Sequence, residues 1–187
     1  MKVFRVQQDV DHFQFAVPIS DDGWVKLQTD GTSLKDKWDL THLRIFNIDG
    51  LRGDFFSFNS DNIIASKYAT DLLLPSLQRC EILPICIGNT EYCFINLIDV
   101  CDCLDSERSK WVYGATTGQK IDIDRYEFYI KKLPSVGLFK LPETRRKEIL
   151  ILESNNFKKD EFRNIYNTSK LTGLTFQLIW ETDNTQY

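Results

Sequence analysis

The feature that most constrains the fold of this chain is an order of elements that occurs twice. Residues 137–180 have two apolar runs typical of strands, then a polar stretch with helical spacing, then a final apolar run. Residues 54–87 repeat this order, with the helical pattern at 67–79 and the closing run at 81–87. A unit of this kind is apolar on one face and must bury that face. We therefore expect the two copies to cover each other in one core.

These patterns predict an α+β protein, mainly of antiparallel strands with two short helices, built around two repeated strand–strand–helix–strand units. Residues 53–187 form the repeat region, and residues 1–52 form a strand-rich segment packed on it, in one compact domain overall. The 187 residues are 42% hydrophobic, which is enough for a substantial core. The two copies match in pattern more than in identity, so a coincidence of two ordinary α+β units is the alternative.

Turn and cap residues place several elements in the repeat region. Ser66 precedes the first helical pattern and is a good N-cap, and Ser154 occupies the same place in the second copy. The apolar runs at 81–87 and 92–97 are separated by a turn that contains Gly88, so we predict an antiparallel hairpin there.

The first fifty residues contain strand patterns and turns. Residues 2–7 and 11–17 are rich in Val and Phe and predict a hairpin that turns near Gln8 and Asp9. The stretch 18–23 has the residue types of a turn. We expect no helix in this part of the chain.

Charge and hydropathy exclude several classes of protein. The net charge is −4 and the pI is about 5.2, whereas nucleic-acid binding needs clustered Lys and Arg. A mildly acidic chain is compatible with a basic protein partner. No run approaches the roughly eighteen apolar residues of a membrane span, and the first residues lack the apolar region of a secretory signal. We expect a cytoplasmic protein that binds neither nucleic acid nor membrane.

Metal and catalytic chemistry find little support in the sequence. The five cysteines have no Cys-x-x-Cys pair, which is typical of reduced core thiols. Zinc held by Cys101 and Cys103 is the alternative, but the two histidines, His12 and His42, are far away in sequence. Either histidine could act as a base, yet neither stands in a motif that supplies a nucleophile. We predict no catalytic residue, no metal and no cofactor.

The polar segment between the two copies, residues 99–124, is where we expect function. One acidic group lies around Asp105, and a second begins at Asp122 and extends just past the segment to Glu127. Such carboxylates could serve acid–base chemistry or hold a hard cation, although their spacing matches no calcium loop, and solvated strand ends are the simpler interpretation. Together they could form an acidic face for a basic partner. The predicted partner-binding residues are Asp99, Asp102, Asp105, Glu107, Arg108, Trp111, Asp122 and Asp124.

Two further features complete the candidate list. Trp38 and Trp111 lie in polar surroundings, which favours partial exposure, and exposed Trp side chains often anchor protein interfaces. The basic run at 145–147 is too short for a nucleic-acid patch and is typical of a solvated turn.

Residues 54–180 contain several short motifs in a characteristic order: Ile64-Ala65-Ser66, Asn96-Leu97, Leu104-Asp105-Ser106-Glu107-Arg108-Ser109, Arg125-Tyr126, Leu133-Pro134, Leu138-Phe139-Lys140-Leu141, Ile151-Leu152-Glu153-Ser154 and Leu171-Thr172-Gly173-Leu174-Thr175-Phe176. In these motifs the chain resembles a family of bacterial immunity proteins from polymorphic toxin systems, the eleventh immunity family. The resemblance implies a protein without enzymatic activity that binds and neutralises a cognate toxin. It assigns no catalytic residue and no cofactor.

The alternative to a toxin-neutralising protein is an enzyme or a small-ligand-binding protein with a cleft between the two repeat copies. A deep pocket lined by His12, Asp105 and Arg108 would favour that alternative. A flat acidic surface with exposed aromatic side chains would favour the binding protein.

Overall fold

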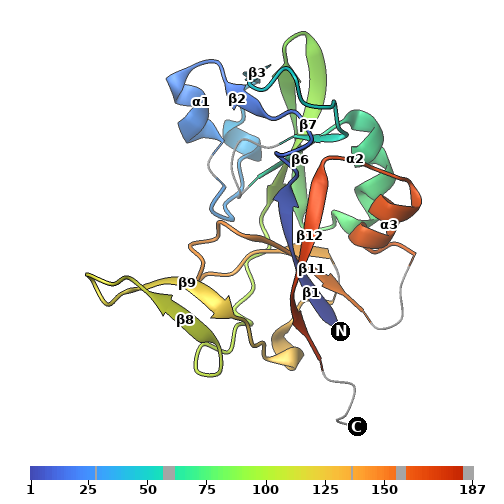
Figure 1. Cartoon of the computed structure of the whole chain (residues 1–187). Helices are drawn as coiled ribbons and strands as arrows, with labels where there is room; N and C mark the ends of the chain where they lie inside the picture. Colours follow the sequence, from blue (N-terminus) through green and yellow to red (C-terminus); the bar gives the residue numbers. More distant parts are fainter. Residues whose placement is uncertain (28, 57–61, 136, 155–158, 183–187) are drawn as a thin grey trace.

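The computed structural model describes residues 1–27, 29–56, 62–135, 137–154 and 159–182. Within these ranges the strands form two larger sheets and one two-stranded ribbon (Figure 1). The smaller of the two sheets has four antiparallel strands, in the order β10 (Gly137–Phe139), β11 (Ile149–Glu153), β1 (Lys2–Gln8) and β12 (Leu174–Glu181).

The larger sheet has six strands, and all of its neighbouring strands are antiparallel except the parallel pair β3 and β6. Their order is β2 (Ala16–Pro18), β3 (Thr41–Ile45), β6 (Cys80–Ile87), β7 (Thr90–Leu97), β5 (Ile63–Ala65) and β4 (Phe55–Phe56). The predicted hairpin between 81–87 and 92–97 is confirmed as β6 and β7, which pair along their full length.

Short helices connect the strands. In the described residues the α-helices are α1 (Asp21–Lys26), α2 (Lys67–Leu73) and α3 (Phe162–Thr168), and the 3₁₀-helices are η1 (Lys35–Lys37), η2 (Leu74–Ser76) and η3 (Ile130–Lys132). The predicted α+β class, with mainly antiparallel strands, is confirmed. The structure adds α1 to the two helices that we expected.

The two segments paired by the sequence have corresponding elements in the structure. Residues 54–87 contain β4, β5, α2 and β6, and residues 137–180 contain β10, β11, α3 and most of β12. In each sheet a strand from outside the segment lies between the second and third strands, namely β7 in the larger sheet and β1 in the smaller. A common origin of the two segments stays a prediction.

One apolar core lies between the two segments. Phe55 of β4 packs against two rings of α3, with centroid distances of 6.3 Å to Phe162 and 5.8 Å to Tyr166. The buried members of this core come from both segments together with Val6 and β7: Val6, Phe55, Ile63, Ala65, Ala69, Leu73, Leu77, Ile95, Leu97, Leu138, Ile149, Ile151, Phe162, Tyr166, Leu171 and Leu174. We call this set the shared core.

The backbones of the two segments also meet directly. The carbonyl of Thr172 accepts hydrogen bonds from the N–H groups of Asp54 (3.0 Å) and Phe55 (3.2 Å). The Asp54 carboxylate in turn accepts the N–H of Thr172 at 2.9 Å. Gly173 has φ +107°, and a Cβ there would lie 2.8 Å from the Phe55 carbonyl oxygen. Glycine is therefore required by both its conformation and its neighbour.

Residues 1–17 do not form the predicted hairpin. β1 and β2 lie in different sheets, and β1 pairs with β11 on one side and β12 on the other. The reason is that side chains on both faces of β1 are buried, with Val3 at 0% and Phe4 at 5% exposure. A strand that is buried on both faces needs long neighbouring strands on both sides. The strand β2 has only three residues and could not serve as such a neighbour.

The helix α1 contradicts the expectation of a helix-free N-terminal part. Its first turn carries Asp21 and Asp22 and its last turn carries Lys26, so the charges complement the helix dipole. The same residue types favour turns, which is why we predicted a turn at residues 18–23.

The two serines that we matched behave differently. Ser66 is confirmed as the N-cap of α2, where its hydroxyl accepts the N–H of Ala69 at 3.1 Å. Ser154 is not the N-cap of α3, because this helix begins at Phe162 after Glu161. The Ser154 hydroxyl instead donates to the Glu161 carboxylate. Residues 57–61 and 155–158, which include parts of the predicted strand and helix, lie outside the described residues.

Replacing Ser66 by alanine removes the N-cap of α2 and leaves the Ala69 N–H without that acceptor. We expect Ser66→Ala to lower the free energy of unfolding by about 1 kcal/mol, measured by urea denaturation. Ser20→Ala is the matched control, because Ser20 precedes α1 but its side chain makes no capping hydrogen bond. Equal effects of the two substitutions would contradict the assignment.

Gly173→Ala introduces a Cβ against the Phe55 carbonyl at a backbone angle that alanine disfavours. We expect a loss of at least about 2 kcal/mol in the free energy of unfolding. Gly118→Ala is the control, since Gly118 also has a positive φ (+62°) but open space around it, and it should cost only about 1 kcal/mol. A cost for Gly173→Ala no larger than that of Gly118→Ala would contradict the close approach.

Candidate functional site

A two-stranded ribbon projects from the side of the molecule (Figure 1). It consists of β8 (Lys110–Tyr113) and β9 (Lys120–Arg125), which pair antiparallel and join neither of the larger sheets. Its inner side is held by Ile123, which is 5% exposed and packs in an apolar core with Trp111. Three apolar side chains remain exposed on the ribbon: Val112 at 40%, Tyr113 at 56% and Ile121 at 65%.

The turn before the ribbon is organised by Asp105. This residue is buried, and its Oδ1 accepts the N–H groups of Glu107 at 3.3 Å and Arg108 at 3.1 Å. Its own N–H donates to the carbonyl of Glu127 at 2.8 Å. A carboxylate bonded to the following backbone in this way stabilises a turn. Asp105 therefore holds the segment in place, and Glu107 and Arg108 are presented to solvent.

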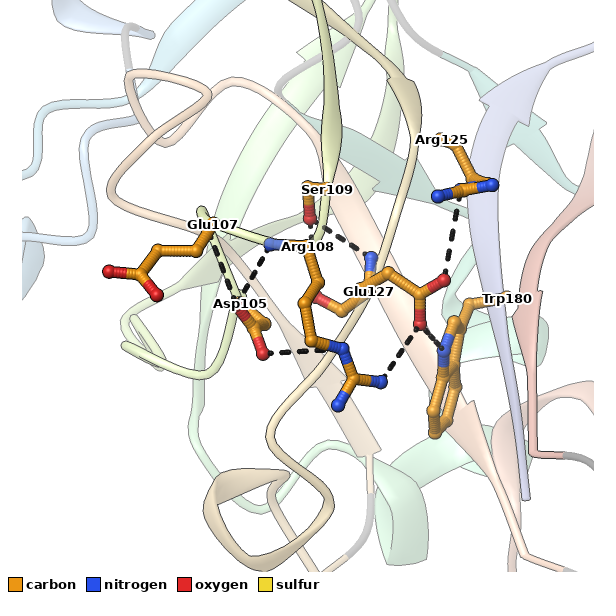
Figure 2. A network of polar contacts seen from close by, with 7 residues as sticks. All are labelled: Asp105, Glu107, Arg108, Ser109, Arg125, Glu127 and Trp180. Atoms are coloured by element: carbon orange, nitrogen blue, oxygen red, sulfur yellow. Dashed lines mark hydrogen bonds and ion pairs between the residues drawn. The ribbon is translucent and has the colours of Figure 1, made fainter.

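A polar network surrounds Glu127, as Figure 2 shows. Its carboxylate lies 3.7 Å from Nη2 of Arg108 and 3.7 Å from Nε of Arg125, and it accepts the indole N–H of Trp180 at 3.4 Å. The two arginine side chains are 71% and 67% exposed. One partly buried carboxylate thus orients two exposed guanidinium groups beside the ribbon. Arg108 is one of the predicted partner-binding residues, whereas Glu127, Arg125 and Trp180 were not among them.

A cavity of about 590 Å³ lies between β9 and the segment 143–148. The Trp111 ring forms part of its wall, and Nζ of Lys120 lies 4.1 Å from the ring centre, which is cation–π geometry. The lining contains side chains of both charges: Ser106, Trp111, Lys120, Ile121, Asp122, Ile123, Glu143, Thr144, Arg145, Lys147 and Glu148. The run at 145–147, which we interpreted as a solvated turn, contributes two of these cations.

One lining residue of this cavity, Glu148, is bonded to β1. Glu148 pairs with Arg5 at 2.6 Å and accepts the Tyr126 hydroxyl at 2.7 Å, while Arg5 also donates to that hydroxyl at 2.6 Å. Burial raises the pKa of the Glu148 carboxyl despite its partners. The sequence carries no local sign of this group, because 121 residues separate Arg5 from Tyr126.

Glu143 is the other partly buried carboxyl beside the cavity. Its Oε2 is enclosed and has no hydrogen-bond partner among the described residues. Burial raises the pKa of the Glu143 carboxyl, Asp102 adds to the increase, and Lys132 and Lys120 oppose it. No local sequence signal marks Glu143, since its environment is made by distant segments.

The remaining predicted residues are dispersed, and most of their charges are paired. Asp99 is buried and lies 3.2 Å from Arg79, beside a second cavity of about 110 Å³. Asp102 pairs with Lys132 at 3.4 Å. The structure brings Asp105, Glu107 and Arg108 together in the turn, and Trp111 and Asp122 together at the larger cavity.

Asp124 and Asp122 lie on β9. Asp124 pairs with Lys110 of β8 at 2.7 Å, and the hydrogen bond from Lys110 lowers the pKa of Asp124. Asp122 accepts the N–H of Ile123 at 2.8 Å. Because several carboxylates have adjacent cations, the acidic face is weaker than the sequence composition suggests.

The two cavities found among the described residues are not of the kind that would favour an enzyme through His12. Neither of the two cavities described above is lined by His12, Asp105 or Arg108. The His12 side chain is 72% exposed and pairs with Asp9 at 2.8 Å. Among the described residues no three His, Cys, Asp or Glu side chains are grouped to hold a metal ion. The five cysteines are free thiols.

No family model matches the sequence, and no curated protein matches it. In the part of the chain that the structure describes, none of the helices has the length and apolar character needed to cross a membrane.

The raised pKa of Glu143 predicts a pH effect on stability. The folded state holds this proton more tightly than the unfolded chain, whose carboxyl has the usual value of 4.5. At pH values just above 4.5, unfolding therefore releases a proton. Rising pH consequently lowers the free energy of unfolding. We expect the stability of Glu143→Gln relative to wild type to increase between about pH 4 and pH 7, measured by urea denaturation.

Glu107→Gln is the matched control for this measurement, because it replaces an exposed carboxyl in the same way. Its stability relative to wild type should change less over the same pH range than that of Glu143→Gln. Equal changes in the two variants would contradict the partial burial of the Glu143 carboxyl.

Proposed function

We propose that this chain is a bacterial immunity protein that binds a cognate protein toxin in the cytoplasm and neutralises it without enzymatic activity. The observation that carries the proposal is the β8–β9 ribbon. It combines exposed Val112, Tyr113 and Ile121 with the charged side chains of Arg108 and Arg125 at its base. Apolar and aromatic groups beside arginines are the typical composition of a protein interface.

The resemblance of residues 54–180 to the immunity family supports the same function from sequence. A stable interface of standard size buries roughly 1,600 Å², and a few aromatic and Arg side chains supply most of its energy. Tyr113, Trp111 and Arg108 are three residues of these types on and beside the ribbon. They are the anchors in this proposal.

The carboxylates have a secondary part in the proposed interface. Asp102 and Asp124 already have cationic neighbours, Lys132 and Lys110, so a basic partner would have to compete for them. Charges of this kind contribute to the rate of association and to orientation more than to affinity. The proposal therefore assigns affinity to the ribbon and steering of a basic toxin to the surrounding acidic groups.

A second candidate function is the binding of a small ligand, and the cavity of about 590 Å³ favours it. Its volume lies in the range of ligand pockets, and Trp111 with Lys120 and Asp122 offers an aromatic wall with convergent polar groups. This cavity lies beside the ribbon, and the cleft that we expected for this function was between the two repeat copies.

The proposed function is tested by co-expression with the protein encoded by the neighbouring gene. We expect that protein to inhibit growth alone and this chain to restore growth. Tyr113→Asp should weaken binding by about tenfold or more, the loss typical of a central interface aromatic, measured by isothermal titration calorimetry and by growth.

Tyr68→Asp is the matched control, because Tyr68 lies on α2 and is 61% exposed, close to the 56% of Tyr113. The control should protect as well as wild type. If the neighbouring protein stays toxic in the presence of wild type, or if both variants protect equally, the ribbon is not a toxin-binding surface.

A further inference from the structure

β12 is an edge strand of the four-stranded sheet, where it pairs with β1 (Figure 1). The N–H of Asp9 donates to the carbonyl of Gly173 at 3.0 Å, which marks a hydrogen-bonded pair at one end of this ladder. Bonded and non-bonded pairs alternate in antiparallel strands. Thr175 and Gln177 therefore bond to β1, and the backbone groups of 174, 176 and 178 point away from it.

The side chain of Tyr166 supports this assignment. Its hydroxyl accepts the N–H of Leu174 at 3.1 Å and donates to the carbonyl of Leu174 at 3.1 Å, so the first outward position is covered. For Phe176 and Leu178, no hydrogen bond from any described residue reaches the outward N–H and C=O groups. Two successive outward positions of the edge are thus open.

The part of β12 before its bulge lacks the usual protection of an edge strand. Residues 174–180 contain no charge, proline or glycine, which are common devices against strand pairing. The Leu178 side chain is 46% exposed. A register shift opposite Val3 and Phe4 leaves Ile179 as a bulge, so the regular open stretch is residues 174–178.

We propose that β12 pairs with β12 of a second copy of this chain, antiparallel about a twofold axis at Gln177. In this register the outward groups of Phe176 bond to those of Leu178 in the other copy, and the symmetric pair does the same. The side chains of Phe176 and Leu178 face each other across the axis, which is a favourable aromatic–aliphatic pair. The two Gln177 side chains meet, and no like charges oppose each other.

The backbone groups and the sequence of β12 indicate that a second copy of the chain pairs with this edge. One register satisfies all the open backbone groups with the same neutral segment, and the two four-stranded sheets become continuous. The contact is short because the bulge at Ile179 limits it. We therefore expect a weak dimer whose population depends on protein concentration. This association does not depend on the proposed toxin binding, since the ribbon is a separate element.

The experiment is sedimentation velocity of the full chain and its variants over about 5 to 500 µM. Gln177→Lys and Gln177→Glu each place like charges together at the axis, and each should raise the dimer dissociation constant about tenfold or more. A one-to-one mixture should restore the dimer, because Lys then faces Glu. Gln119→Lys and Gln119→Glu are controls on an exposed glutamine between β8 and β9.

Circular dichroism and thermal unfolding establish that each variant is folded, which matters because Arg5 lies 3.4 Å from Gln177. A wild type that stays monomeric over the whole range would overturn the proposal. A dimer that persists in both Gln177 variants, or fails to return in the mixture, would also overturn it. If wild type is always monomeric and the Gln177 variants lose binding to the protein encoded by the neighbouring gene, the edge of β12 pairs with a strand of that partner instead.

Discussion

The shared core between the two strand–helix units is the constraint on which the other features of this structure depend. Phe55 packs against Phe162 and Tyr166, so a residue near the end of the first third of the chain is buried by the last helix. The backbone junction of Thr172 and Gly173 with Asp54 and Phe55 holds the two units in one register. Because α3 is fixed in this way, Tyr166 can cap one position of β12, and the next positions remain open.

The sequence predicted elements whose signals are local. The hairpin of β6 and β7 and the cap at Ser66 follow from alternation, turn residues and one hydroxyl. The partners of β1 could not be predicted this way, because Val3 and Val6 are buried by strands at the other end of the chain. The helix α1 was missed because Ser-Asp-Asp-Gly favours a turn and a helix start alike.

In the candidate site, too, the features made by residues close in sequence could be predicted, and those made by distant residues could not. The polar segment was recognisable from its carboxylates and Trp111, and the turn at Asp105 is made by neighbours in sequence. Its cavity was not recognisable, since Glu143 and Glu148 line it from a distant loop and Glu148 pairs with Arg5 of β1. Lys140 is a further example: it reads as a polar interruption of an apolar run, yet it is fully buried and donates to Thr29, 111 residues away.

The central claim, that the ribbon and its base are the protein-binding surface, is tested most directly by hydrogen exchange. The amides of the chain would be compared with and without the protein encoded by the neighbouring gene. The account predicts that amides of residues 105–125 exchange about tenfold or more slowly in the complex. Protection confined to residues 46–51, where Phe46, Ile48 and Leu51 are also exposed, would contradict it, as would no protection at all.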